Sequence, residues 1–113
     1  MSANRRRGEI AAELDGKEFG LCLTLGALAE LEAAFAAEDI GRLIERFSSG
    51  KLSALDMIRI IGAGLRGAGE AVSDEDVGKM VATGGAAGYA AIVSDLLITT
   101  FGGAAGETTP SRP

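Results

Sequence analysis

Three glycines at residues 62, 64 and 67 match the G-x-G-x-x-G pattern, which holds a pyrophosphate when it joins a strand to a helix. Here the pattern follows an apolar run, residues 57–61, whose spacing is that of a helix rather than a strand. No helix of useful length follows the glycines, and no acidic residue lies about 20 positions further on to hold a ribose. We interpret the match as a chance occurrence in a chain with 17 glycines and predict no nucleotide site.

Asp74, Glu75 and Asp76 bring together three carboxylates, which are the ligands that hard cations prefer. Nothing in the pattern supplies the remaining ligands, so we interpret the three acids as the first turn of a short helix, where they favour its dipole. The chain has one cysteine, Cys22, and no histidine. These counts exclude an intramolecular disulfide, a cysteine-based metal cluster and acid–base chemistry on histidine. We therefore predict no metal, cofactor or catalytic residue, and we do not expect an enzyme.

Composition predicts one small domain with a thin core. The chain has 113 residues, of which 47% are hydrophobic and 4% aromatic, so Ala, Leu, Ile and Val must supply the core. The formal net charge is −5, from 11 basic and 16 acidic residues, which argues against nucleic-acid binding. No apolar run approaches the roughly 20 residues that cross a bilayer, and the N-terminus lacks the apolar part of a secretory signal. We expect a soluble, cytoplasmic protein.

The dipeptide Asp15-Gly16 lies between two alternating runs and favours the type I′ turn of a β-hairpin. A two-residue turn pairs Leu14 with Lys17 and, further along the strands, Ile10 with Leu21. This register places six apolar side chains on one face of the hairpin: Ile10, Ala12, Leu14, Phe19, Leu21 and Leu23. A two-stranded ribbon alone is marginal in water, so helices must cover this face.

Capping residues and apolar periodicity predict four to five short helices after the hairpin. The expected helices are about 26–37 after the N-cap Thr24, Asp39 to Gly50, Ser53 to Leu65, a short helix from Ser73 that carries Val77, Met80 and Val81, and about 86–101. Four arginines are expected to point away from the apolar stripes: Arg42, Arg46, Arg59 and Arg66. The glycines of residues 62–69 are expected to weaken and end the third helix.

The predicted fold class is α+β, with an N-terminal two-stranded β-hairpin followed by these helices. Residues 8–101 form a single domain, residues 1–7 a flexible N-terminal tail and residues 102–113 a disordered C-terminal tail. The N-terminal tail carries Arg5, Arg6 and Arg7, the one basic cluster. We interpret the cluster as a solvated tail; the alternative is a weak contact with an acidic partner or nucleic acid.

The end of the last helix is apolar on more than one side. When Tyr89 defines the core direction at 100° per residue, Leu97 and Phe101 lie progressively off the stripe and Ile98 lies nearly opposite. A helix with this pattern is either buried all round or contacts a partner. We predict Ile98 and Phe101, together with Leu97, as a partner-binding surface; the alternative is an ordinary exposed isoleucine.

Four segments resemble the gene-transfer-agent and phage family of small tail-assembly proteins, which are also labelled tail tube proteins. The segments are Gly8-Glu9, Asp15-Gly16, Leu23-Thr-Leu-Gly-Ala-Leu-Ala-Glu-Leu-Glu32 and Gly62-Ala-Gly-Leu-Arg-Gly-Ala-Gly69. The resemblance covers roughly residues 8–101, and residues 23–32 are its most specific part. The family carries no established catalytic residues, so none are transferred to this chain.

The resemblance implies a non-enzymatic tail-assembly chaperone that binds the tape-measure protein and helps to recruit tail tube subunits. The first alternative is a structural component that stays in the particle as a tail tube or tail-completion protein. The second is a small helical regulator, including a DNA-associated one, which the net charge disfavours. The expected partners are the tape-measure protein and the tail tube protein of a phage-like particle, with self-association as a further mode, and neither nucleic acid nor membrane.

Overall fold

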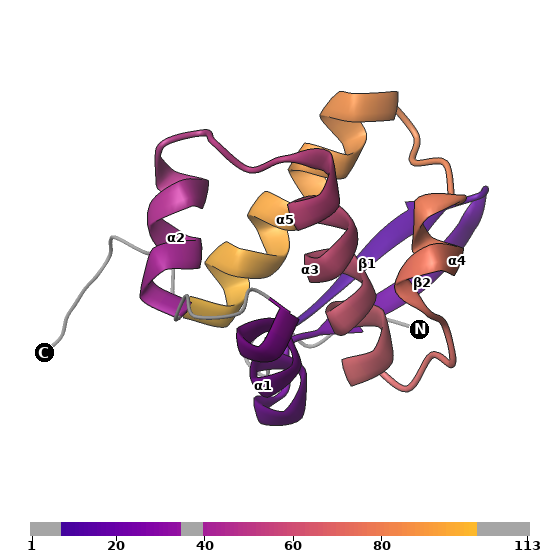
Figure 1. Cartoon of the computed structure of the whole chain (residues 1–113). Helices are drawn as coiled ribbons and strands as arrows, with labels where there is room; N and C mark the ends of the chain where they lie inside the picture. The colour runs from indigo at the N-terminus through magenta and orange to yellow at the C-terminus, as the bar shows by residue number, and fades with distance from the viewer. Residues whose placement is uncertain (1–7, 35–39, 102–113) are drawn as a thin grey trace, which may run out of the picture.

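The computed structural model describes residues 8–34 and 40–101 of the chain (Figure 1). In this part the elements are, in chain order, β1 (Glu9–Leu14), β2 (Lys17–Cys22), α1 (Leu25–Ala34), α2 (Ile40–Ser48), α3 (Ala54–Gly67), α4 (Asp74–Gly78) and α5 (Gly85–Phe101). An antiparallel pair of strands followed by five helices confirms the predicted α+β class. The two predicted tails, the Asp39 cap and the apolar position Phe35 lie outside the described residues.

The hairpin has the predicted turn and register. Asp15 and Gly16 both have positive φ, 56° and 74°, as a type I′ turn requires. Leu14 pairs with Lys17 and Ile10 with Leu21, so the side chains of Ile10, Leu14 and Leu21 lie on one face and are fully buried. The turn chemistry and the alternation of apolar residues therefore agree with the tertiary structure.

The starts of α1, α3 and α4 are also as predicted, because each depends on residues within one turn. The Thr24 hydroxyl accepts a hydrogen bond from the N–H of Ala27 at 3.1 Å at the start of α1. At the start of α3, Ser53 and Asp56 form a complete capping box, and Ser73 and Asp76 form another at the start of α4. The extent of α4 differs from the prediction, since it ends at Gly78 and leaves Met80 and Val81 in the connection to α5.

α3 runs through the middle of the molecule and packs against β2, α1, α4 and α5 (Figure 1). Its residues 60–65 are all buried. The helix runs two residues past the predicted Leu65 and ends at Gly67, and Gly69, with φ of 101°, follows, so the helix does end within the glycine segment as predicted. Gly62, Gly64 and Gly67 lie inside the helix, and a Cβ on Gly64 would lie 2.8 Å from Cδ2 of Leu96. These glycines let neighbouring elements approach α3 closely. Their helical setting confirms that the G-x-G-x-x-G match is not a strand-to-helix loop.

The connection between α4 and α5 is hydrogen-bonded to the hairpin turn. Ala82 forms an isolated antiparallel bridge with Leu14, the Asp15 N–H donates to the Val81 carbonyl at 2.8 Å, and the Val81 N–H donates to the Asp15 carboxylate at 2.9 Å. α5 then packs across α3 and β1. Among the described residues, ten large side chains are almost fully buried and form one core: Ile10, Leu14, Leu21, Leu31, Ile60, Ile61, Leu65, Val93, Leu96 and Leu97.

α2 is joined to α3 by an ion pair that no pattern in the sequence indicates. The Arg46 guanidinium donates to Oδ1 of Asp56 at 2.7 Å, and Asp56 is only 6% exposed. Arg46 therefore points toward α3, a contact that the prediction of its place opposite the apolar stripe of α2 does not indicate. The reason is that Asp56, which already accepts the Ser53 N–H in the capping box, has a second oxygen available to an arginine from another helix.

Candidate protein-binding surfaces

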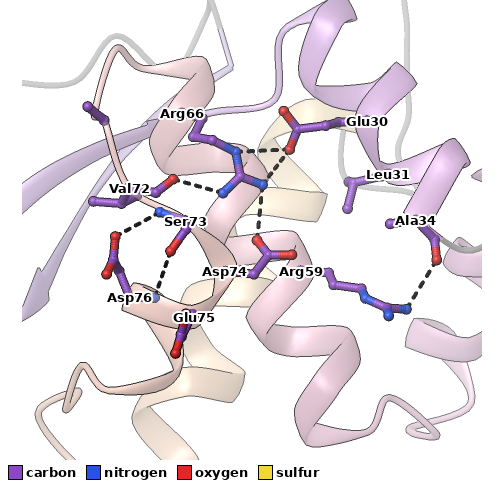
Figure 2. Close-up of a pocket in the computed structure, with 11 residues that line it drawn as sticks. Glu30, Leu31, Ala34, Arg59, Arg66, Val72, Ser73, Asp74, Glu75 and Asp76 are labelled. Carbon is purple, nitrogen blue, oxygen red and sulfur yellow. Dashed lines mark hydrogen bonds and ion pairs between the residues drawn. The ribbon is translucent and has the colours of Figure 1, made fainter.

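An open groove with a volume of about 840 Å³ lies between α1, α3 and the loop that enters α4 (Figure 2). Its lining combines apolar residues with a charged rim: Glu30, Leu31, Ala34, Arg59, Arg66, Ala71, Val72, Ser73, Asp74, Glu75 and Asp76. The three acids of α4 stand out in the sequence, but no pattern in it indicates that they share a groove with two arginines of α3.

Arg66 is the centre of this groove and joins four segments of the chain (Figure 2). Its guanidinium donates twice to Oε1 of Glu30 in α1, once at 3.0 Å, and once to Oδ1 of Asp74 in α4 at 3.0 Å. It also donates to the Val72 carbonyl at 3.0 Å. The hydrogen bond with Glu30 raises the pKa of Arg66 above its ordinary value. Arg66 was predicted only to point away from the apolar stripe of its helix; the structure shows that its guanidinium donates to groups of three other segments.

Arg59 closes the other end of the same groove. Its guanidinium donates to the carbonyl of Ala34, the last residue of α1, at 3.1 Å (Figure 2). A cation at this position satisfies a terminal carbonyl and stabilises the negative end of the helix dipole. The prediction that Arg59 points away from the apolar stripe does not indicate this contact, because helix periodicity does not show which neighbouring element a long side chain can reach.

The acids of α4 mainly serve the helix start. The Ser73 N–H donates to Oδ2 of Asp76 at 3.0 Å, and this backbone hydrogen bond lowers the pKa of Asp76 below its ordinary value. Asp74 is paired with Arg66, which leaves Glu75 on the exposed rim. Within residues 8–34 and 40–101, no group of three or more cysteine, aspartate and glutamate side chains is placed to hold a metal ion. The groove is thus a structural joint between α1, α3 and α4.

Two further grooves on either side of Met57 are lined without a single charged residue. The first, of about 190 Å³, is lined by Ala54, Met57, Ile58, Ile61, Val77, Gly78, Met80 and Tyr89. The second, of about 270 Å³, is lined by Phe47, Gly50, Leu52, Met57, Ala90, Val93 and Ser94. In the first, the Tyr89 hydroxyl donates to the Met80 carbonyl, so its polar end is already satisfied. Such apolar linings suit contact with protein side chains.

The three residues of the predicted surface at the end of α5 differ in their exposure. Leu97 is 1% exposed and belongs to the core, so its inclusion in a surface is wrong. The buried stripe of α5 is centred on Val93, Leu96 and Leu97 and not on Tyr89, which is only partly buried and therefore gave a misleading reference direction. Ile98 is 40% exposed, and Phe101 is half-buried against the core.

The helices in the described part of the chain are too short or too polar to span a bilayer. No curated protein and no solved structure matches the chain. A protein-family model does match, over residues 7–103, and its description is "Phage tail tube protein, GTA-gp10". The matched range includes every strand and helix described above. The chain therefore belongs to the GTA-gp10 family of phage tail tube proteins.

Proposed function

We propose that this chain is a non-enzymatic structural component of a phage-like tail, which stays in the finished particle as a tail tube or tail-completion protein. The family match over residues 7–103 carries this proposal, because the family description names a part of the tail itself. The same description favours this structural role over the chaperone role, which was the main function implied by the sequence resemblance. The proposed setting is the cytoplasm of the bacterial cell that assembles the particle.

The arrangement of charged groups supports a role without catalysis. The arginines and acids of the groove around Arg66, except Glu75 on its rim, are bound to one another or to helix ends, and these bonds hold the fold together. The grooves on either side of Met57 offer apolar side chains instead. We propose that the chain acts through protein–protein contacts, and that Ile98 and Phe101 contribute to one contact surface.

A second candidate function is the tail-assembly chaperone that binds the tape-measure protein and recruits tail tube subunits. One observation favours it: among the residues that the structure describes, the exposed large apolar side chains come from several different elements. They are Leu25, Leu55, Val81 and Ile98. Permanent interfaces bury large continuous apolar areas, whereas transient contacts are smaller.

Particle composition separates the two candidates. Purified particles are analysed by quantitative mass spectrometry, and the abundance of this chain is compared with that of the other tail proteins. A fixed stoichiometry in the finished particle supports the structural role. Absence from particles, combined with copurification of the tape-measure protein from producing cells, supports the chaperone. Absence from particles without any tail protein in the copurified material contradicts both.

A further inference from the structure

α2 is the least buried helix in the described part of the chain. Each of the other four helices has at least one buried residue, and α3 has seven. In α2, the residues whose exposure the structure describes are half-buried, as Ile44, Arg46 and Phe47 are, or exposed. The helix lies at one side of the molecule and approaches α1 more closely than α3 or α5 (Figure 1). Elements with few buried side chains open at a lower free energy than the core.

An uncharged groove lies where α2 meets α3 and α5. The groove, of about 270 Å³, is lined by Phe47 of α2, Leu52 of the connection to α3, Met57 of α3 and Val93 of α5, among others. The first three side chains are half-buried, whereas Val93 is only 1% exposed. The packing of α2 on α5 is therefore incomplete, and separating the two helices would expose little apolar area.

α2 and α3 are capped independently of each other. At the end of α2, Gly50 has a φ of 73°, and the N–H of Lys51 donates to the Arg46 carbonyl at 2.9 Å. At the start of α3, Ser53 opens the capping box described above. Rotation at Leu52, which lies between the two caps, can therefore move α2 without breaking either of them.

Arg46 joins α2 to the cap of α3. Its guanidinium donates to Oδ1 of Asp56 at 2.7 Å, while Oδ2 of Asp56 accepts the Ser53 N–H at 2.9 Å. Because the two bonds use different oxygens, release of Arg46 leaves the bond between Asp56 and Ser53 in place. The ion pair therefore restrains the position of α2 without being needed for the start of α3.

We propose that α2 opens as a unit away from α3 and α5 by rotation at Leu52, and that the Arg46–Asp56 ion pair sets the population of the open state. Opening moves Phe47 off the groove and gives access to Val93, which is covered in the closed state. α2 thus controls access to an apolar surface of α3 and α5 while the core of α3, α5 and the hairpin stays folded.

Cysteine labelling of the full chain measures this opening, whatever role the chain has in a tail. In a Cys22→Ala background, Val93→Cys places a thiol in the groove. Leu96→Cys is the matched control on the same helix, because Leu96 is fully buried against α3 beside Gly64 and does not line the groove. Without denaturant, the thiol at residue 93 should react with a bulky reagent about a hundredfold faster than the thiol at residue 96.

The dependence of these rates on urea separates local opening from global unfolding. The rate at residue 93 should change little at low urea concentrations, because opening of α2 exposes little surface. The rate at residue 96 should rise steeply, because only global unfolding exposes it. Circular dichroism checks that both cysteine variants are folded. Equal rates with equal urea dependence at the two positions would overturn the separate opening of α2.

A second comparison tests the ion pair as the restraint. Arg46→Met keeps an unbranched side chain but removes the ion pair, and it should speed labelling at residue 93 about tenfold, with the same weak dependence on urea. Glu45→Gln removes a charge from the neighbouring exposed position of α2 and should leave the rate unchanged. An unchanged rate in Arg46→Met, or an equal acceleration in Glu45→Gln, would overturn the role of the Arg46–Asp56 pair.

Discussion

Gly67 of α3 lies directly against the main chain of Cys22 in β2, so closely that a Cβ atom on Gly67 would overlap the Cys22 carbonyl oxygen. The overlapping atom belongs to the backbone of a strand and cannot move aside as a flexible side chain can. Two positions that are 45 residues apart in the chain (67 − 22) are therefore brought together at a residue without a side chain.

Gly67→Ala should lower the free energy of unfolding by about 2 kcal/mol, because overpacking against the strand outweighs the higher helix propensity of alanine. Chemical denaturation of both proteins measures the difference. Gly26→Ala in α1 is the matched control, since a Cβ there meets only the Thr24 hydroxyl oxygen at 3.9 Å. The control should be neutral or stabilising. Equal stability of Gly67→Ala and the wild type would show that α3 and β2 are further apart.

The Arg46–Asp56 pair should be strongly coupled. Asp56→Ala removes both the capping box of α3 and the partner of Arg46, and we expect a loss of about 3 kcal/mol of unfolding free energy. Arg46→Ala should cost less, because its side chain is 31% exposed. In a double-mutant cycle, the loss for both changes together should be smaller than the sum of the single losses by roughly 1 kcal/mol or more. Additive losses would mean that the interaction between Arg46 and Asp56 contributes nothing to the free energy of unfolding.

The hairpin turn should depend on the positive φ of Gly16. Gly16→Val forces a β-branched residue to φ near 74° and should cost about 1 kcal/mol or more. Gly16→Asn is the control, because asparagine tolerates this conformation and should cost less. Denaturant midpoints compare the three proteins. If valine and asparagine lower the stability equally, backbone strain at position 16 is not the cause of the loss.

The cap of α4 should make part of the stability depend on pH. The hydrogen bond from the Ser73 N–H holds the pKa of Asp76 below its ordinary value of 3.8, so the unfolded chain binds this proton more readily than the folded one. The contribution of Asp76 is therefore fully present above pH 3.8 and is lost as the pH falls through the lower pKa of the folded state.

Comparison with Asp76→Asn isolates this contribution. The wild type should have the higher unfolding midpoint at neutral pH, and the two midpoints should converge as the solution becomes more acidic than pH 3.8. Glu75→Gln is the control for simple loss of charge in the same turn, since Glu75 does not take part in the capping box. A difference between the wild type and Asp76→Asn that stays constant with pH would contradict the assignment.

Signals within one turn of chain were sufficient to predict the local elements of this protein. Asp15-Gly16 specifies a turn whose twist matches the strands, and the alternation of Ile10 to Leu14 then admits only one register that buries the apolar face. Ser53 and Ser73 mark helix starts because their capping partners are three residues away. The family resemblance likewise rests on residues that lie close together in sequence, and the family match confirms it.

Contacts between distant segments were decided only by the tertiary structure. Glu30 and Arg66 are 36 positions apart, and no spacing rule indicates that they meet. The burial of Leu97 depends on where α3 and β1 lie around α5, and the close packing at Gly64 and Gly67 depends on which elements face α3. Helix periodicity gives the directions of side chains relative to one another, but not the direction of the core. That direction is set by the packing of the other elements, because burying the largest apolar area is a property of the whole domain.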